Sequence, residues 1–295
     1  MRTAVWLAGA LACGATSATA ESWFDFKGSL GPGRHQRYVP PVSNPLFNET
    51  PYITTELRPI YFHQDIPGEF LTGGGEIDVV AAEVRIALTE RLGFIASKDG
   101  YANIDFKGGL PDETGFANIS AGLKYAVISD PATNTILTLG AEYEPPTGDL
   151  ETAGISLQGR GDGFVDLFVT GARAWGPVGL QASAGVNLAI DGDHDSSMLH
   201  YSAHLDLEVS PRFYPLIEVN GFTVVDDGSR NGFRFEGTDL VNFGATDAGT
   251  VVTLAAGARY MVADWLRIGA AFEAPITDRR DLLDRRLYFD LVLTY

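Results

Sequence analysis

The feature that most restricts the fold of this chain is a strict alternation of short and long connections between extended segments. About twelve segments have the composition and length of β-strands: residues 53–63, 78–88, 93–99, 116–128, 135–143, 164–174, 178–190, 198–209, 213–224, 250–262, 266–274 and 286–295. The short connections are residues 89–91, 129–134, 175–177, 210–212 and 263–265. The longer, mostly more acidic ones are residues 64–77, 106–115, 144–163, 191–197, 226–249 and 275–285. In an antiparallel sheet this alternation places the short turns at one edge and the long loops at the other.

Within the segments, apolar and polar residues alternate. In residues 199–208 the apolar side chains fall at odd positions, and the polar ones, such as His200 and His204, fall at even positions. Residues 287–295 repeat the pattern, with Asp290 on the more polar side. Successive side chains of a strand point to opposite faces, so each strand has one apolar and one wetter face. A soluble β-sandwich shows the same alternation, which by itself leaves both folds open.

The connections favour a barrel in a membrane. An even number of strands of roughly 9–11 residues, with short turns on one side and long loops on the other, is typical of transmembrane barrels. No apolar run reaches the roughly 18 residues of a transmembrane helix, so only strands could cross. Aromatic residues lie near the short turns, where an interfacial girdle is expected: Trp175, Tyr214, Tyr260, Trp265 and Tyr295. We predict an all-β fold, a closed antiparallel transmembrane β-barrel of about twelve strands over residues 51–295.

The amino end has the pattern of a secretory signal peptide. Arg2 precedes an apolar stretch at residues 4–12, and Ala18-Thr19-Ala20 supplies a small-residue cleavage site, so we expect residues 1–20 to be removed. Cys13 makes a lipoprotein an alternative, although the residue three positions upstream is alanine where leucine is usual. Cleavage after Ala20 would remove the only cysteine, which excludes disulfides and thiol nucleophiles from the mature chain.

Residues 21–50 differ from the rest. Glycine and proline cluster at Gly31-Pro32-Gly33 and Pro40-Pro41, which disfavours a strand ladder and indicates an irregular periplasmic segment. Five aromatic residues there would suit a small plug that enters the barrel. A disordered tail is the alternative, and we favour it from the sequence alone.

The charge excludes one class of partner. The whole chain carries a formal charge of −17, with 21 Lys and Arg against 38 Asp and Glu. Loss of Arg2 leaves 20 basic residues, hence −18. The acidic residues are spread over turns and strands, and no basic footprint for nucleic acid is present. No cofactor and no metal are expected.

The wetter faces of the strands carry charges of both signs. The residues predicted to line the lumen are Glu83, Arg85, Lys124, Glu142, Asp166, His200, His204, Asp206, Glu208, Glu218, Arg259, Arg267, Glu273 and Asp290. Charges inside a barrel need water or a partner. They would either set the selectivity of a narrow aqueous pore or pair across the lumen and close it. Twelve strands lie between a filled and an open barrel. Small residues on this face, such as Gly140 and Gly257, favour a narrow or gated pore.

Three weaker patterns suggest other chemistry. His200-Tyr201-Ser202 resembles the His-x-Ser pair of outer-membrane lipid hydrolases, but the pair is predicted to face the lumen, where lipid substrates do not lie. Residues 191–195, Asp-Gly-Asp-His-Asp, space carboxylates as some calcium sites do, but the downstream Glu of an EF-hand loop is missing. We favour a solvated external turn over weak binding of a divalent cation shared with lipopolysaccharide. Arginines near the last loop could contact lipopolysaccharide phosphates or pair with the aspartates between them: Arg279, Arg280, Arg285 and Arg286.

The mature chain resembles Gram-negative outer-membrane β-barrels. Its last strand, with Phe289, Leu291, Leu293 and Tyr295 on one face, is similar to the signal that the barrel-assembly machinery reads. Residues 48–67 and 87–93 resemble transporters named for the MetA pathway of phenol degradation. The resemblance implies a Gram-negative outer-membrane location, contact with lipid and lipopolysaccharide, and a passive channel for small solutes, with aromatic molecules as candidates. It brings no catalytic residues. A lipid hydrolase and a closed structural barrel acting through its external loops are the alternatives.

Overall fold

The computed structural model describes residues 24–295, apart from residues 160 and 248. The expected signal peptide lies outside this range. Within the range, no helix is long and apolar enough to cross a membrane.

The described residues form sixteen β-strands of very different lengths. The first eight are β1 (Glu56–Ile66), β2 (Gly75–Ala87), β3 (Leu92–Lys98), β4 (Tyr101–Phe106), β5 (Glu113–Phe116), β6 (Ser120–Asp130), β7 (Thr135–Glu144) and β8 (Glu151–Thr152). The others are β9 (Ile155–Ser156), β10 (Phe164–Trp175), β11 (Val178–Ala189), β12 (Ser197–Leu207), β13 (Phe213–Asp226), β14 (Thr250–Ala263), β15 (Leu266–Pro275) and β16 (Arg285–Thr294).

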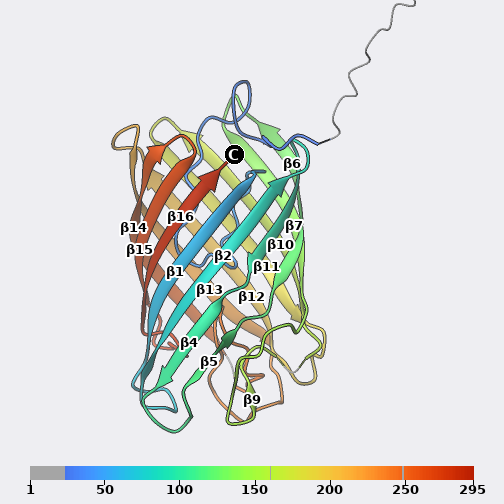
Figure 1. Ribbon diagram of the computed structural model, residues 1–295, viewed down its shortest axis with the longest axis vertical. Helices are drawn as coiled ribbons and strands as arrows, with labels where there is room; N and C mark the ends of the chain where they lie inside the picture. Colours follow the sequence, from blue (N-terminus) through green and yellow to red (C-terminus); the bar gives the residue numbers. More distant parts are fainter. Residues whose placement is uncertain (1–23, 160, 248) are drawn as a thin grey trace, which may run out of the picture.

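Twelve strand positions close into an antiparallel barrel (Figure 1). Each strand pairs with its neighbour around the wall, and β1 pairs with both β2 and β16, from Glu56 opposite Thr294 to Asp65 opposite Arg285. Closure satisfies the backbone groups that an open edge would expose. The predicted fold class is therefore confirmed.

Two wall positions are interrupted, which the sequence did not predict. β3 and β4 together occupy the third position, with Asp99 and Gly100 between them, and β5 and β6 form the fourth. Asp99 accepts a hydrogen bond from the Ala82 amide at 2.8 Å, and Gly100 has a φ of 127°, which favours glycine. This bulge shifts the alternation by one residue, so ending the strand at residue 99 was wrong. A small hairpin, β8–β9, lies in the following long loop.

The outer face of the barrel is a belt of exposed apolar side chains. Leu139, Leu167, Leu205 and Ile217 on four different strands are each close to half exposed. Of the five aromatic residues predicted for the girdle, Trp175, Tyr260, Trp265 and Tyr295 are exposed. The fifth was misplaced: Tyr214 is 7% exposed on the inner face and donates a hydrogen bond to the Pro211 carbonyl at 3.3 Å. Its position relative to the strand alternation, not its closeness to a turn, decides where it points.

Residues 24–55, which we call the lumenal segment, run inside the barrel (Figure 1). The segment starts at the end with the short turns, where the Asp25 amide donates to the Leu88 carbonyl at 3.0 Å. Residues 38–46 and 48–54 are almost all buried. From the sequence we favoured a disordered tail here. For residues 24–50 that expectation was wrong, because the segment lies in the barrel with many of its residues buried. Proline and glycine indicate only that the segment forms no strand. They do not show that many of its side chains contact the wall.

A second filling lies at the end with the long loops. We call it the apolar cluster; its members include Phe62, Ile66, Phe70, Ile77, Val79, Ile104, Leu150, Leu157, Val241, Phe243 and Leu282. Its wall residues come mainly from β1, β2 and β4, with Leu216, Ala271 and Tyr288 from β13, β15 and β16, and most of the others come from loops. Phe70 packs against Phe235 with ring centroids 5.2 Å apart, and Phe233 against Phe243 at 5.9 Å. The loops therefore cover the mouth through side chains that would otherwise be exposed to water.

Candidate functional site: the lumenal segment and its ionic belt

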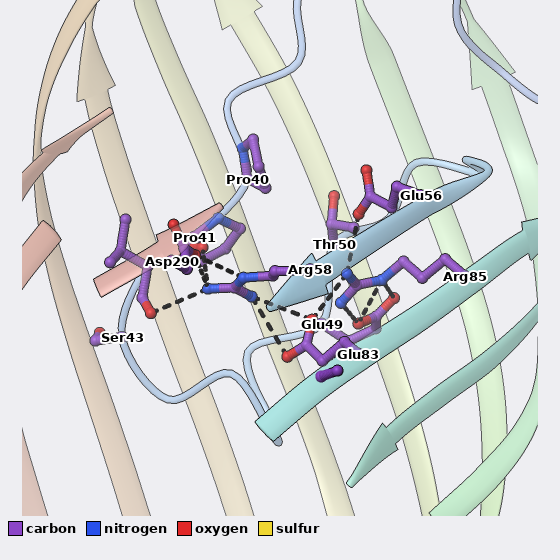
Figure 2. Close-up of polar contacts among 12 residues, drawn as sticks. Pro40, Pro41, Ser43, Glu49, Thr50, Glu56, Arg58, Glu83, Arg85 and Asp290 are labelled. Carbon is purple, nitrogen blue, oxygen red and sulfur yellow. Dashed lines mark hydrogen bonds and ion pairs between the residues drawn. The ribbon is translucent and has the colours of Figure 1, made fainter. Parts of the chain in front are cut away.

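Buried ion pairs contact the lumenal segment along part of the wall, and Figure 2 shows those made by Arg58 and Arg85. We call the group the ionic belt: the basic residues Arg58, Arg85, Lys124 and Arg259, and the carboxylates Glu49, Glu56, Glu83 and Asp290. All eight are buried. Four positive charges thus face four negative ones, and the lumenal segment itself supplies one of the carboxylates, Glu49. Without Glu49, the wall residues of the belt would be four basic groups and three carboxylates.

Asp290 on β16 joins two arginines. Arg58 Nε donates to one carboxylate oxygen at 2.6 Å, and Arg259 binds both oxygens at 2.5 and 2.7 Å. The same guanidinium groups donate to carbonyl groups of the lumenal segment: Arg58 to Pro41 at 3.0 Å and Arg259 to Pro40 at 2.5 Å. Proline offers a carbonyl acceptor without an amide donor that would need a partner. The Pro-Pro pair is therefore well suited to face two guanidinium groups.

Glu49 joins the lumenal segment to β2 and β6. It accepts hydrogen bonds from Arg85 Nε at 2.9 Å and from Lys124 Nζ at 2.6 Å, and Lys124 also donates to the Thr50 carbonyl at 2.8 Å. Burial opposes ionisation of Glu49, but the two adjacent cations prevail and lower its pKa to about 2. The two cations therefore stabilise the charged form of this carboxylate, and the contact is ionic.

A third anchor is Glu218 on β13. Its carboxylate accepts hydrogen bonds from the amides of Val42 and Ser43 at 2.9 and 2.7 Å, and from His204 Nδ1 at 2.7 Å. A carboxylate that caps two consecutive amides fixes the local turn of the chain. The lumenal segment is thus held by a carboxylate of β13 and by basic side chains of β1, β2, β6 and β14.

Neutral groups complete the contact around the wall. Thr138 and Thr170 donate to the Pro51 and Glu49 carbonyls at 2.6 and 2.7 Å, and Gln181 donates to the Val39 carbonyl at 2.5 Å. The lumenal segment therefore contacts most of the circumference and occupies the lumen.

Most residues predicted to line the lumen lie buried inside it. Twelve of them are less than 9% exposed: Glu83, Arg85, Lys124, Glu142, His200, His204, Asp206, Glu218, Arg259, Arg267, Glu273 and Asp290. Asp166 is half-buried and lies 2.8 Å from His200 Nε2. Glu208, at the rim, pairs at 3.3 Å with Arg37 of the lumenal segment. The structure brings Glu83, Arg85, Lys124, Arg259 and Asp290 together in the belt. It places Glu142 apart, with Ser97 and Ser120 as its partners at 2.6 Å.

Sequence reasoning missed several members of the site. Glu56 and Arg58 alternate with outward Leu57 and Pro59, so the period-two pattern could have identified them. Arg286, which binds Asp239 of a long loop at 2.6 Å, alternates in the same way with outward Arg285 and Leu287. Glu49 lies in a segment without periodicity, and no local signal marks it.

The small lumenal residues do not leave an open path. At Gly140 the space of a side chain is taken by the Phe168 ring, and at Gly185 by the His200 ring. A Cβ atom at Gly257 would lie 2.7 Å from that of Ala271. The expectation that they make room for a pore was wrong, because larger neighbours on the adjacent strands occupy the volume.

The hydrolase pattern does not form a catalytic arrangement. Ser202 donates to Asn220 Oδ1 at 2.8 Å and accepts from Asn44 at 3.3 Å, whereas His200 pairs with Asp166 and stacks on Phe47. Both His200 and Ser202 are buried beneath the lumenal segment, away from the lipid-facing surface. A serine without a base as its partner is not activated as a nucleophile.

The loop motifs also find internal partners. Among the described residues, no group of three or more His, Cys, Asp or Glu side chains could hold a metal ion. Asp191 pairs with His194 at 2.8 Å, and Asp195 with Arg230 at 3.0 Å. The turn over residues 191–195 is therefore held by its own ion pairs.

Four arginines near the last loop are all paired. Arg279 binds Asp281 at 2.7 Å, Arg280 binds Asp284 at 2.5 Å and Arg285 binds Asp65. Arg286 is 1% exposed inside the lumen, so its proposed contact with lipopolysaccharide was wrong. Strand alternation turns it inward, opposite to its neighbour.

Comparison with solved structures identifies the class of fold. An outer-membrane channel from Pseudomonas putida F1 aligns over 90% of this chain and 100% of its own, with a TM-score of 0.58 and 12% identity. The NanC porin aligns over 82% of this chain and 99% of its own, with a TM-score of 0.50 and 8% identity. The translocator domain of the autotransporter NalP from Neisseria meningitidis aligns over 82% and 89%, with a TM-score of 0.51 and 11% identity. Neither the family models nor the curated proteins compared with the sequence gave a match. At these identities the similarity shows the fold, that of an outer-membrane β-barrel.

Proposed function

We propose that this protein is an outer-membrane channel for small solutes and that the lumenal segment is its gate. The short-turn end would face the periplasm and the long loops the outside, as in other barrels of this class. The exposed apolar belt and the similarity in fold to channels and porins support this placement. Contact of the last strand with the assembly machinery, and of the loops with lipopolysaccharide, remain predictions.

One observation carries the gate: the lumenal segment makes no strand ladder with the wall. Among the described residues, its contacts with the wall involve side chains almost throughout, and the backbone hydrogen bonds are those of Asp25 with Leu88 and of Thr55 with Tyr295, near the two ends of the segment. A segment held in this way can leave without opening the barrel. The wall of the barrel keeps its own closure through β1 and β16.

The apolar cluster bears on the solute. A solute that enters from the loop end would meet Phe70, Phe235 and Phe243, whose rings pack together beneath the long loops. We therefore expect solutes with an apolar or aromatic part, which agrees with the MetA-type resemblance. Identification of the solute rests on transport measurements.

Single-channel recording in planar bilayers tests the proposal. We expect the mature chain to be mainly closed, and a variant without residues 24–50 to conduct steadily. Heat-dependent mobility in detergent gels should show that both are folded. If the folded deletion variant stays closed, the barrel is structural and the channel proposal fails. Esterase activity lost in Ser202→Ala would replace it with the lipid hydrolase.

A further inference from the structure

A groove on the outer wall is lined by small residues and by one arginine, Arg173, that forms none of the ion pairs among the described residues. On the outward face of β7, β10 and β11, Gly171 lies opposite Leu137 on one side and Ala182 on the other, and Val169 lies opposite Ala184. These small residues leave a concavity of about 360 Å³ in a surface that elsewhere carries leucines. Arg173, two residues further toward the short turn, lines the same concavity.

Arg173 differs from the other outward-facing arginine of the wall. Arg285 is paired with Asp65, whereas none of the ion pairs among the described residues includes Arg173. Its guanidinium lies over the ring of Trp175, 5.2 Å from the ring centroid. A tryptophan at this height marks the boundary between acyl chains and headgroups. An arginine held there faces the layer where lipid phosphates lie.

We propose that this groove binds one phospholipid of the periplasmic leaflet, with its phosphate on Arg173 and one acyl chain along Gly171, Ala182 and Ala184. Guanidinium groups bind phosphate oxygens in a bidentate manner. The four residue-to-residue steps from Arg173 to Val169 span about 13 Å, room for much of an acyl chain. The inference rests on the proposed membrane placement but not on channel activity.

A larger groove shows why the cation matters. The outer concavity near Pro59, Ala258 and Ala270 measures about 630 Å³, yet its lining contains no lysine or arginine. Acyl chains of any membrane lipid can cover it, because no basic side chain selects a phosphate. It therefore serves as the matched control, a groove of similar kind that lacks the arginine.

Native mass spectrometry of the detergent-solubilised barrel, titrated with palmitoyl-oleoyl-phosphatidylglycerol, tests the site. We expect one tightly bound lipid, about tenfold weaker binding in Arg173→Gln, and severalfold weaker binding in Ala182→Leu. Ala258→Leu and Arg212→Gln, a change at a different short turn, should bind within about twofold of the unaltered protein. Phosphatidylethanolamine, which has the same phosphate, should also bind at this site.

Equal binding by all variants would overturn the site. Should Arg173→Gln fail to fold, Ala182→Leu carries the test, since Ala182 is an exposed side chain on the outer face. The channel proposal is judged separately by conductance of the deletion variant. A deletion variant that conducts, together with a protein that binds no lipid at this site, would refute only the lipid-binding groove. Lipid binding by a barrel that never conducts would refute only the channel.

Discussion

The ionic belt and the apolar cluster close the same lumen by different physical means. In the belt, each charge is buried and depends on specific partners, as Asp290 does on Arg58 and Arg259. In the apolar cluster, residues such as Phe243 and Ile77 contribute through area removed from water, which is non-directional. Removal of one charge leaves others uncompensated, whereas removal of one methyl group costs only its own share. The belt should therefore respond to mutation sharply and the cluster gradually.

The largest effect is expected for Asp290→Asn. The change leaves Arg259 without a carboxylate, with the neutral Pro40 and Pro41 carbonyls beside it, and takes from Arg58 its closest carboxylate. Breaking a buried pair by removing one partner costs about 3–5 kcal/mol. Urea unfolding of the detergent-solubilised protein should show this loss. Asp264→Asn, in a short turn, should change the free energy of unfolding by less than about 0.5 kcal/mol, and an equal effect of both changes would contradict the comparison.

Glu49→Gln tests the belt from the side of the lumenal segment. Lys124 loses the carboxylate that binds it, whereas Arg85 keeps Glu56 and Glu83 in the wall. A cost of about 3 kcal/mol, borne by the closed state alone, would raise the open fraction roughly a hundredfold. Single-channel recording measures it directly. Glu69→Gln, in a long loop, is the control. An unchanged open fraction in Glu49→Gln would show that the ionic belt does not hold the gate closed.

The wall and the lumenal segment differ in how far the sequence predicts them. Alternation placed Glu83, Arg85 and Lys124 on the lumenal face because a strand gives each side chain only two choices. The lumenal segment offers no such rule. Proline and glycine excluded a strand there, but the partner of Glu49 is set by the three-dimensional path of the segment. The same limit explains why small residues such as Gly140 were interpreted as free space, since the neighbour that fills it lies on another strand.

The loops over the apolar cluster should loosen as pH rises. Burial raises the pKa of Asp281 to about 6, although Arg279 opposes the shift, and burial also raises the pKa of Glu236. A raised pKa means that the packed loops bind the proton more tightly than free chain does. The resulting stabilisation is complete below about pH 4 and is lost as pH rises through about 6, and amounts to at most about 3 kcal/mol for Asp281.

A spin label reports this loosening. Gly232 is exposed with open space around it, and a cysteine there would be the only thiol of residues 24–295. We expect label mobility to increase between pH 4 and 7. Asp281→Asn, which mimics the protonated acid, should remove most of the change, and Glu236→Gln the remainder. A change of the same size in the double variant would assign the pH dependence to other groups.

The smallest effect is expected inside the apolar cluster, from Ile77→Val. Ile77 is 1% exposed on β2, and the change removes one methylene group without creating a polar group that lacks a partner. Such changes cost about 1 kcal/mol. Urea unfolding measures it, with Val80→Ala on the lipid-facing side of the same strand as the control in detergent.

Because the cost is spread over many contacts, Ile77→Val combined with Phe243→Leu should be close to additive, whereas Asp290→Asn combined with Arg259→Gln should not. A strongly non-additive result in the cluster would mean that it, like the belt, depends on particular pairs.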